Sequence, residues 1–171
     1  MNRSSSPSSS YPLDVVAAIL EQENLDCVVL EQGVALKTAM SLDDDTSWGS
    51  TIEIAPLSDE IQALVVFSRP PEPLPEAGHL VDTLKLINRI NANLMAVGNF
   101  EIDLDDGSIR FKSSVDYENV GLTPELVRNV FAPAAFTMDR YLQGLLAVMF
   151  GNTDPAEIIE AIESDAADIV G

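Results

Sequence analysis

The sequence has very few of the residues that build disulfide frameworks, metal sites or nucleophilic catalysts. Its 171 residues include one cysteine, Cys27, and one histidine, His79. A single cysteine excludes an intramolecular disulfide, and a single histidine excludes a metal site built on a histidine pair. The phosphate-binding glycine patterns and the GxSxG pattern of esterases are also absent. We therefore expect no enzyme activity, no catalytic residues, no cofactor and no metal site.

Basic residues and long apolar runs are scarce as well. Nine lysines and arginines stand against 28 aspartates and glutamates, which gives a formal net charge of −19. Such a charge repels phosphate backbones and anionic lipid, so neither nucleic-acid nor membrane-surface binding is expected. No apolar run approaches the roughly 20 residues of a membrane span, and no secretory signal is evident. These observations favour a cytoplasmic protein whose acidity serves solubility or a basic partner.

Composition predicts one domain between two tails. Residues 1–11 are rich in serine and predict a disordered tail. Residues 12–164 are predicted to form a single domain, because a chain of this length with 46% hydrophobic residues can bury one core. Residues 165–171 are predicted to be a flexible tail.

The most informative stretch is the predicted hairpin over residues 99–116. Apolar and charged residues alternate on both sides of Asp106-Gly107, and an Asp-Gly pair favours a two-residue type I′ turn. Such a turn would place Leu104 opposite Ile109, and Ile102 opposite Phe111. It would also pair Asp103 with Arg110, and Glu101 with Lys112 on the other face.

Other segments predict further strands and helices. Strands are expected over 27–31 and 34–38 as a hairpin, over 48–55, and over 61–67. The last is apolar on both faces, so it is either central in the sheet or meets a partner with one face. Helices are expected over 12–23 and 76–96. The second helix is predicted to bury Leu80, Leu84, Ile87, Asn91 and Leu94, with Val81 and Ile90 beside them. For the polar Asn88 and Asn91, we favour structural bonds to nearby backbone over contacts with a ligand or partner.

The C-terminal part is predicted to be helical. Thr123-Pro124-Glu125 is a typical helix start, and Pro133 is expected to divide or kink the helix, with a second segment over 134–150. A last helix should begin at Asp154-Pro155 and run to about Glu163. The second segment is apolar nearly all round, so it is predicted to contribute both to the core and to a dimer or partner interface. The candidate interface residues are Leu142, Leu145, Met149 and Phe150. Mixed helices and short-linked strands indicate an α+β fold with an antiparallel sheet.

Three segments of the chain form a recognisable set. They are residues 86–91 (Leu-Ile-Asn-Arg-Ile-Asn), residues 98–102 (Gly-Asn-Phe-Glu-Ile), and residues 138–142 (Met-Asp-Arg-Tyr-Leu) with Gly144 and Gly151 after them. In this order and spacing, the three segments resemble the YbjN-like family of bacterial proteins. The resemblance implies the fold of type III secretion chaperones, in the order helix, strands, helix, hairpin and helices. It also implies a homodimer without catalytic residues. Members of the family are often labelled sensory transduction regulators.

Three functional hypotheses remain open at this point. The first is a chaperone-like or regulatory homodimer that holds a basic or disordered segment of a protein client. The second is a structural subunit that uses the same surface in a permanent complex. The third is a small-molecule sensor with a pocket that the sequence does not reveal.

Overall fold

The computed structural model describes residues 12–30, 35–41, 47–56, 58, 62–72, 74–93, 95–118 and 120–170, the side chains of 93 and 165–170 excepted. The predicted serine-rich tail, residues 1–11, lies outside this set. The elements in chain order are α1 (Pro12–Gln22), β1 (Val28–Val29), β2 (Ala35–Ser41), β3 (Ser47–Pro56), β4 (Gln62–Arg69), α2 (Leu80–Asn93), β5 (Asn99–Ile102), β6 (Ile109–Asp116), α3 (Pro124–Phe150) and α4 (Pro155–Val170).

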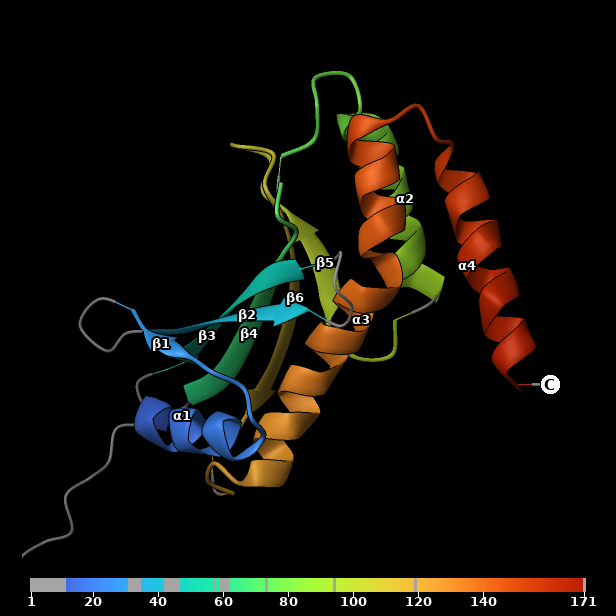
Figure 1. Cartoon of the computed structure of the whole chain (residues 1–171). Coiled ribbons are helices and arrows are strands. Elements are labelled where there is room, and N and C mark those ends of the chain that lie inside the picture. The colour runs from blue at the N-terminus through green and yellow to red at the C-terminus, as the bar shows by residue number, and fades with distance from the viewer. Residues whose placement is uncertain are drawn as a thin grey trace, which may run out of the picture.

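The strands form one antiparallel sheet in the order β1-β2-β3-β4-β6-β5 (Figure 1). Helix α1 contacts β2 and β3, and α3 contacts β4 and β6, so these two helices cover one face. Helix α2 packs against α3 and the edge strand β5, and α4 packs against α2 and α3. The predicted α+β class with an antiparallel sheet is confirmed.

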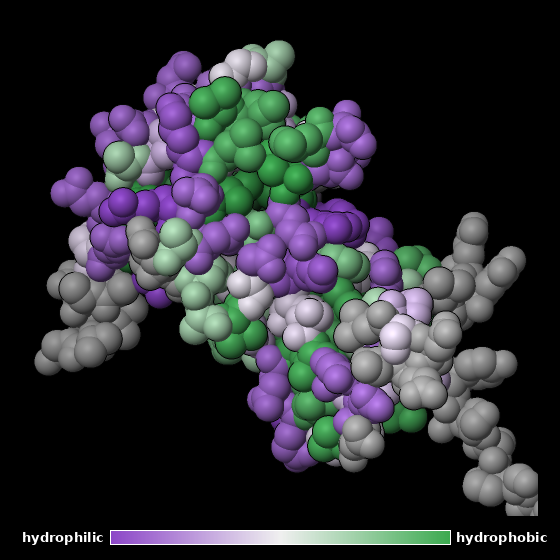
Figure 2. Space-filling view, turned by 180° about the vertical axis from the view of Figure 1, so that it is seen from behind, coloured by the Kyte–Doolittle hydropathy of each residue, from purple (hydrophilic) through white to green (hydrophobic). Residues whose placement is uncertain are grey.

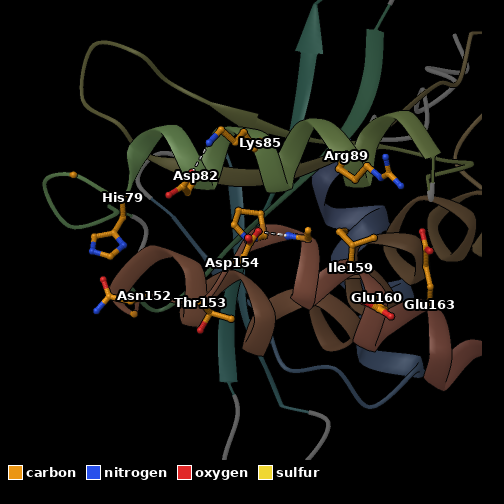
Figure 3. Close-up of a pocket in the computed structure, with 14 residues that line it drawn as sticks. His79, Asp82, Lys85, Arg89, Asn152, Thr153, Asp154, Ile159, Glu160 and Glu163 are labelled. Atoms are coloured by element: carbon orange, nitrogen blue, oxygen red, sulfur yellow. Dashed lines mark hydrogen bonds and ion pairs between the residues drawn. The ribbon is translucent and has the colours of Figure 1, made fainter.

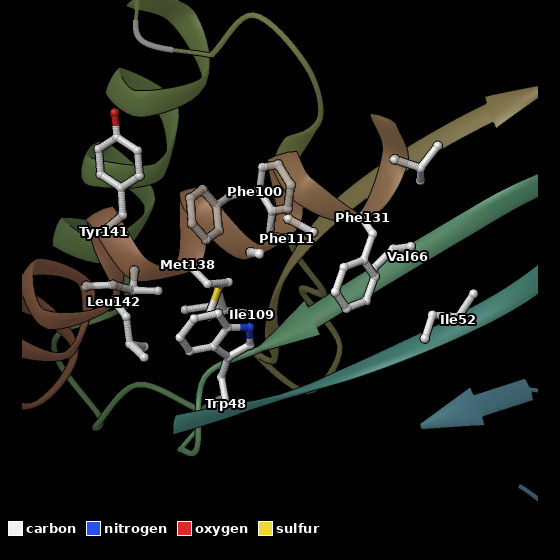
Figure 4. Packing of buried hydrophobic residues seen from close by; sticks show 14 of the residues in the cluster. Trp48, Ile52, Val66, Phe100, Ile109, Phe111, Phe131, Met138, Tyr141 and Leu142 are labelled. Atoms are coloured by element: carbon white, nitrogen blue, oxygen red, sulfur yellow. The ribbon is translucent and has the colours of Figure 1, made fainter. Parts of the chain in front are cut away.

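The core lies between the sheet and α3. Phe100, Ile109 and Phe111 from the hairpin meet Met138 and Tyr141 from the helix, and all five are at most 2% exposed (Figure 4). The Phe100 ring lies edge-on to Phe111 at 5.3 Å and to Tyr141 at 6.3 Å between centroids, an arrangement that aromatic rings prefer. The hairpin is therefore joined to α3 mainly by aromatic packing.

Strand β4 lies inside the sheet, as its continuous apolar run predicted. It lies between β3 and β6, and its four residues from Ala63 to Val66 are all buried. Leu64 and Val66 join the core under the helices, whereas Ala63 and Val65 belong to the opposite face. The prediction that this strand is central is confirmed.

The hairpin of β5 and β6 has the predicted faces but not the predicted register. Ile102 pairs with Ile109, and Phe100 pairs with Phe111, which is a shift of two residues from the expected pairing. Because the shift is even, the same side chains still share a face. Leu104 lies in the loop instead of the strand and is 74% exposed.

The turn at Asp106 and Gly107 explains the register error. Gly107 has a φ of +78°, but Asp106 lacks the positive φ that a type I′ turn needs. Instead, the Gly107 amide donates to the Asp103 carbonyl, and the Asp103 carboxylate accepts from the Asp105 amide. Six residues, 103–108, thus connect the two strands, and carboxylate bonds to the loop backbone favour this longer connection.

Helix α2 buries only part of the predicted stripe: Ile87 and Ile90 are buried as expected, but other predicted members are not. Asn88, expected to be buried near the helix end, is exposed, and the predicted Leu94 lies outside the described residues. The helix spans Leu80–Asn93, shorter than the expected 76–96, and its buried residues are Thr83, Leu86, Ile87 and Ile90. Leu80 and Val81 are 37% and 60% exposed, so their place in the buried stripe is wrong. Thr83 was missed because it is polar, yet its hydroxyl donates to the His79 carbonyl at 2.8 Å, which satisfies it in the core.

Helix α3 runs unbroken through Pro133, so the predicted division into two segments is wrong. Proline removes one helical hydrogen bond, but Val130 and Phe131 before it and Ala134 after it are all buried. This packing holds both halves on the sheet. The predicted start is confirmed, because the Thr123 hydroxyl accepts from the Leu126 amide at 3.2 Å. Helix α4 continues to Val170, past its predicted end near Glu163.

Candidate functional site

An open groove runs between α2 and α4 and is about 780 Å³ in volume (Figure 3). One wall comes from α2, the other from α4, and the loop 151–154 closes one end. The side chains that line it from α2 are Asp82, Lys85 and Arg89, with His79 just before the helix; those from α4 include Ile159, Glu160 and Glu163.

The segment that enters α2 is fixed to the end of α3. The Glu76 amide donates to the Met149 carbonyl at 3.1 Å, and His79 Nδ1 lies 3.2 Å from the Val148 carbonyl oxygen. The last carbonyls of a helix have no partner within the helix, so these contacts satisfy two of them. A ring nitrogen beside a carbonyl oxygen must be the donor, so His79 has a structural role at the groove entrance.

Helix α4 begins and packs in ways that fix the second wall. The Asp154 carboxylate accepts from the Ala156 amide at 2.8 Å, which caps the first turn as the sequence predicted. Farther along, α4 approaches α3 at Gly144, where a Cβ would lie 2.5 Å from Ile158 Cγ2. Glycine at this position therefore allows the close approach of the two helices.

The groove is more acidic than basic. It is lined by four carboxylates, Asp82, Asp154, Glu160 and Glu163, and by the two cations Lys85 and Arg89. Lys85 Nζ lies 2.7 Å from Asp82 Oδ1. That hydrogen bond and the Asp82 charge raise the pKa of Lys85, with a smaller contribution from Asp154. With Lys85 already paired, the groove favours a positively charged ligand.

Apolar side chains are exposed beside this groove. Leu74 in the crossover is 50% exposed, and Leu80 and Val81 follow directly after His79. Figure 2 views the molecule from the side opposite to α1 and α3 and shows an apolar area at its top, over the crossover and α2. Exposed apolar residues that border a polar groove are typical of protein-binding surfaces.

The predicted interface residues on α3 lie mainly in the core. Leu142, Leu145 and Met149 are fully buried within the chain, and Phe150 is half-buried. A partner could reach the first three only if the helices around them moved apart. The most exposed large apolar residue on α3 is instead Phe136, at 67%.

Two other residues considered in the sequence have structural roles. The Asn91 side chain donates to the Phe100 carbonyl and accepts from the Phe100 amide, both at 2.9 Å, as a neighbouring strand would. The structural interpretation of Asn91 is confirmed. In the hairpin loop, hydrogen bonds from Ser108, first from its side chain and then from its amide, lower the pKa of Asp106. Asp106 and Gly107 therefore shape the loop.

The groove residues were not predicted as a site, because they come from two helices about 70 residues apart in sequence. The available signals were the solvent-facing Lys85 and Arg89, and the spacing of Glu160 and Glu163, which places them on one side of a helix. Within the described residues, no group of three or more histidines, cysteines, aspartates or glutamates is arranged to hold a metal ion. In that same part of the chain, no helix is both long and apolar enough to cross a membrane.

Comparison with known proteins gives one clear match. No curated protein matches the chain significantly. Residues 12–147 match the model of the YbjN family, which carries the description "Putative bacterial sensory transduction regulator". The match spans α1 to most of α3 and so includes the whole sheet and one wall of the groove. Because it covers well over half of the sequence, the chain belongs to the YbjN family.

Proposed function

We propose that this chain is a non-enzymatic, chaperone-like or regulatory protein that holds a basic or disordered segment of a protein client. The family description points to a regulatory role in bacterial sensory transduction. The observation that carries the proposal is the acidic groove between α2 and α4, with the exposed Val81 next to its lining residue Asp82. A segment that contains lysine or arginine and a few apolar residues complements both features.

The groove dimensions suit a peptide segment. Its two walls are helices, and a partner helix or extended strand can lie along such a groove with apolar anchors at its border. Arg89 is the cation in the groove with no ion pair among the described residues, so a client carboxylate next to its basic residues would find a partner there. The contact of His79 Nδ1 with the Val148 carbonyl supports a structural role for this histidine at the groove.

A homodimer in the cytoplasm is part of the same proposal. What supports a second copy is Phe136, a large aromatic residue exposed on the outer side of α3. Large apolar residues exposed on one helix are a common component of homodimer interfaces. Sedimentation equilibrium should give a molecular mass of twice the 18.4 kDa of one chain. The Phe136→Asp variant should have the mass of a single chain. A single-chain mass for the unmodified protein would contradict the homodimer.

The client proposal is tested by capture from a lysate of the source organism at two salt concentrations, followed by mass spectrometry. The informative variant is Glu160→Gln/Glu163→Gln, which removes two carboxylates from the groove. The control is Glu21→Gln/Glu118→Gln, which removes the same charge from exposed positions on α1 and after β6. We expect one recurrent partner with a basic segment, lost at high salt and with the groove variant, but kept with the control.

Two results would overturn the proposal. A partner retained equally by the groove variant and the control would place binding elsewhere. No recurrent partner in either salt condition would favour the alternative of a small-molecule sensor, since a concavity of about 780 Å³ also suits a small ligand. A partner that never dissociates from the purified chain would instead favour a structural subunit.

A further inference from the structure

The face of the sheet opposite to α1 and α3 carries an unusual share of the basic residues. Eight lysines and arginines lie in the described part of the chain, and four of them project from this face. They are Lys37 on β2, Arg69 on β4, and Arg110 and Lys112 on β6. We call these four residues the basic sheet face. In a protein with a net charge of −19, this clustering requires an explanation.

The strand register places these side chains around Phe67. Lys37 pairs with Thr51, Thr51 with Phe67, and Phe67 with Lys112, so these residues form one row across four strands. Arg69 lies two positions after Phe67 on β4, so it projects from the same face. Arg110 lies two positions before Lys112 on β6 and also projects from that face. Figure 2 shows hydrophilic side chains across the middle of this side of the molecule.

Aromatic contacts hold the two arginines in place. The Arg110 guanidinium lies 4.2 Å from the centroid of the Phe67 ring, and that of Arg69 lies 5.8 Å from it. A guanidinium over an aromatic face is attracted to the ring and loses side-chain freedom. The two arginines are thus oriented before any ligand binds, which lowers the entropic cost of binding.

Ion pairs within the sheet account for only half of these cations. Arg110 lies 2.9 Å from one oxygen of Glu101, and Lys112 lies 3.6 Å from the other. This cluster strengthens the β5–β6 pairing. Lys37 and Arg69 have no ion pair with the described residues. Glu53 lies two positions after Thr51 on β3, on the same face. With Glu101 and Glu53 counted against the four cations, the formal charge of these described residues is about +2.

We propose that the basic sheet face binds a short protein segment rich in aspartate and glutamate. Guanidinium groups bind carboxylates through two parallel hydrogen bonds, and Arg69 presents such a group beside the Phe67 ring without an ion pair to the described residues. A long phosphate polymer would meet the anionic remainder of the protein, whereas a short acidic segment fits within the positive area. This partner surface is separate from the acidic groove, whose residues belong to α2 and α4.

The proposal is tested by fluorescence anisotropy with a labelled peptide of ten glutamates, and with ten glutamines as the control peptide. The test variant is Lys37→Gln/Arg69→Gln, which removes the two cations that have no ion pair. The control variant is Arg128→Gln/Arg140→Gln, which removes two exposed cations from α3. Circular dichroism melts confirm that each variant is folded.

We expect the glutamate peptide to bind at physiological salt and the glutamine peptide not to bind. The test variant should weaken binding by about tenfold or more, because two charge-assisted contacts are lost. Arg128→Gln/Arg140→Gln should leave binding within about twofold of the unmodified protein, because both arginines lie on α3, which covers the opposite face of the sheet. Neither result depends on the groove. Client capture through Glu160 and Glu163 can therefore fail while binding of the glutamate peptide persists, and binding of the glutamate peptide can fail while client capture persists.

Four outcomes would overturn the proposal. They are no binding of the glutamate peptide, equal weakening by Arg128→Gln/Arg140→Gln, complete displacement of the peptide by millimolar inorganic phosphate, and self-association of the protein that the test variant abolishes. The third would assign the face to a small anion. The fourth would assign it to the acidic surface of a second copy.

Discussion

Replacing Gly98 by alanine tests the junction between α2 and the hairpin most sharply. Gly98 has a φ of +76°, and a Cβ at this position would overlap the Phe111 ring and lie 2.7 Å from the Lys112 carbonyl oxygen. Phe111 is fully buried against α3, so its ring has little space to move. The substitution therefore has two separate costs, one from backbone conformation and one from steric overlap.

The two costs can be estimated separately. A left-handed backbone costs alanine about 1–2 kcal/mol relative to glycine. Forcing an extra carbon into a packed core costs about 1–3 kcal/mol more. Gly98→Ala should therefore lower the free energy of unfolding by about 2–5 kcal/mol, which corresponds to a fall in Tm of about 5–15 °C for a domain of this size.

A matched control isolates the steric cost. Gly121 has a φ of +74°, almost the same as that of Gly98, but a Cβ there would have no neighbour within 4 Å. Gly121→Ala should cost only the backbone term, about 1–2 kcal/mol. Urea titrations followed by circular dichroism measure both variants. Equal losses for Gly98→Ala and Gly121→Ala would refute the close packing of Gly98 against β6.

Three further predictions follow from the described contacts. Asn91→Ala should lower the free energy of unfolding by about 1–3 kcal/mol, because the amide and the carbonyl of Phe100 both lose their partner. Amide hydrogen exchange at Phe100 should accelerate, and unchanged exchange would contradict the role of Asn91. Leu145→Glu should abolish cooperative unfolding in a thermal melt, because it buries an unpaired carboxylate at a site with no exposed area, at a cost on the order of 4–5 kcal/mol; a folded variant would refute the buried placement. Burial, followed by the Glu21 and Asp26 charges, raises the pKa of the Cys27 thiol, so less thiolate is present at neutral pH. Reaction with a disulfide reagent should be slower than that of free cysteine at pH 7.5 and should increase as the pH rises past 9; a rate equal to that of free cysteine would contradict this.

The sequence predicted elements better than their contacts. The faces of the hairpin follow from alternation alone, because a period of two survives any even shift in register. The register itself depends on whether Asp103 and Asp106 bond to loop amides, and this competes with the type I′ turn that Asp-Gly favours. The error at Pro133 has a similar origin, since burial on both sides of that residue outweighs its helix-breaking tendency.

The buried face of α2 and the groove depended on tertiary packing. The helix carries apolar residues over more than half of its circumference, so its sequence is compatible with more than one buried stripe. Contact with α3 selects Leu86 and Ile90 and leaves Val81 exposed. The groove then arises where α4 returns beside α2, and that approach depends on Gly144, whose contact with Ile158 no local pattern reveals.

The most direct test of the account is an amide chemical-shift map of the ¹⁵N-labelled protein titrated with a ten-residue peptide of alternating lysine and leucine. If the groove holds basic segments, the shifts should concentrate on residues 79–89, at and within the start of α2, and on residues 151–163, in the loop before α4 and its first turns. These shifts should saturate with rising peptide concentration and fit a single dissociation constant. Shifts spread evenly over exposed carboxylates on α1, the hairpin loop and α3 would show that the peptide follows net charge alone, and would contradict a binding site in the groove.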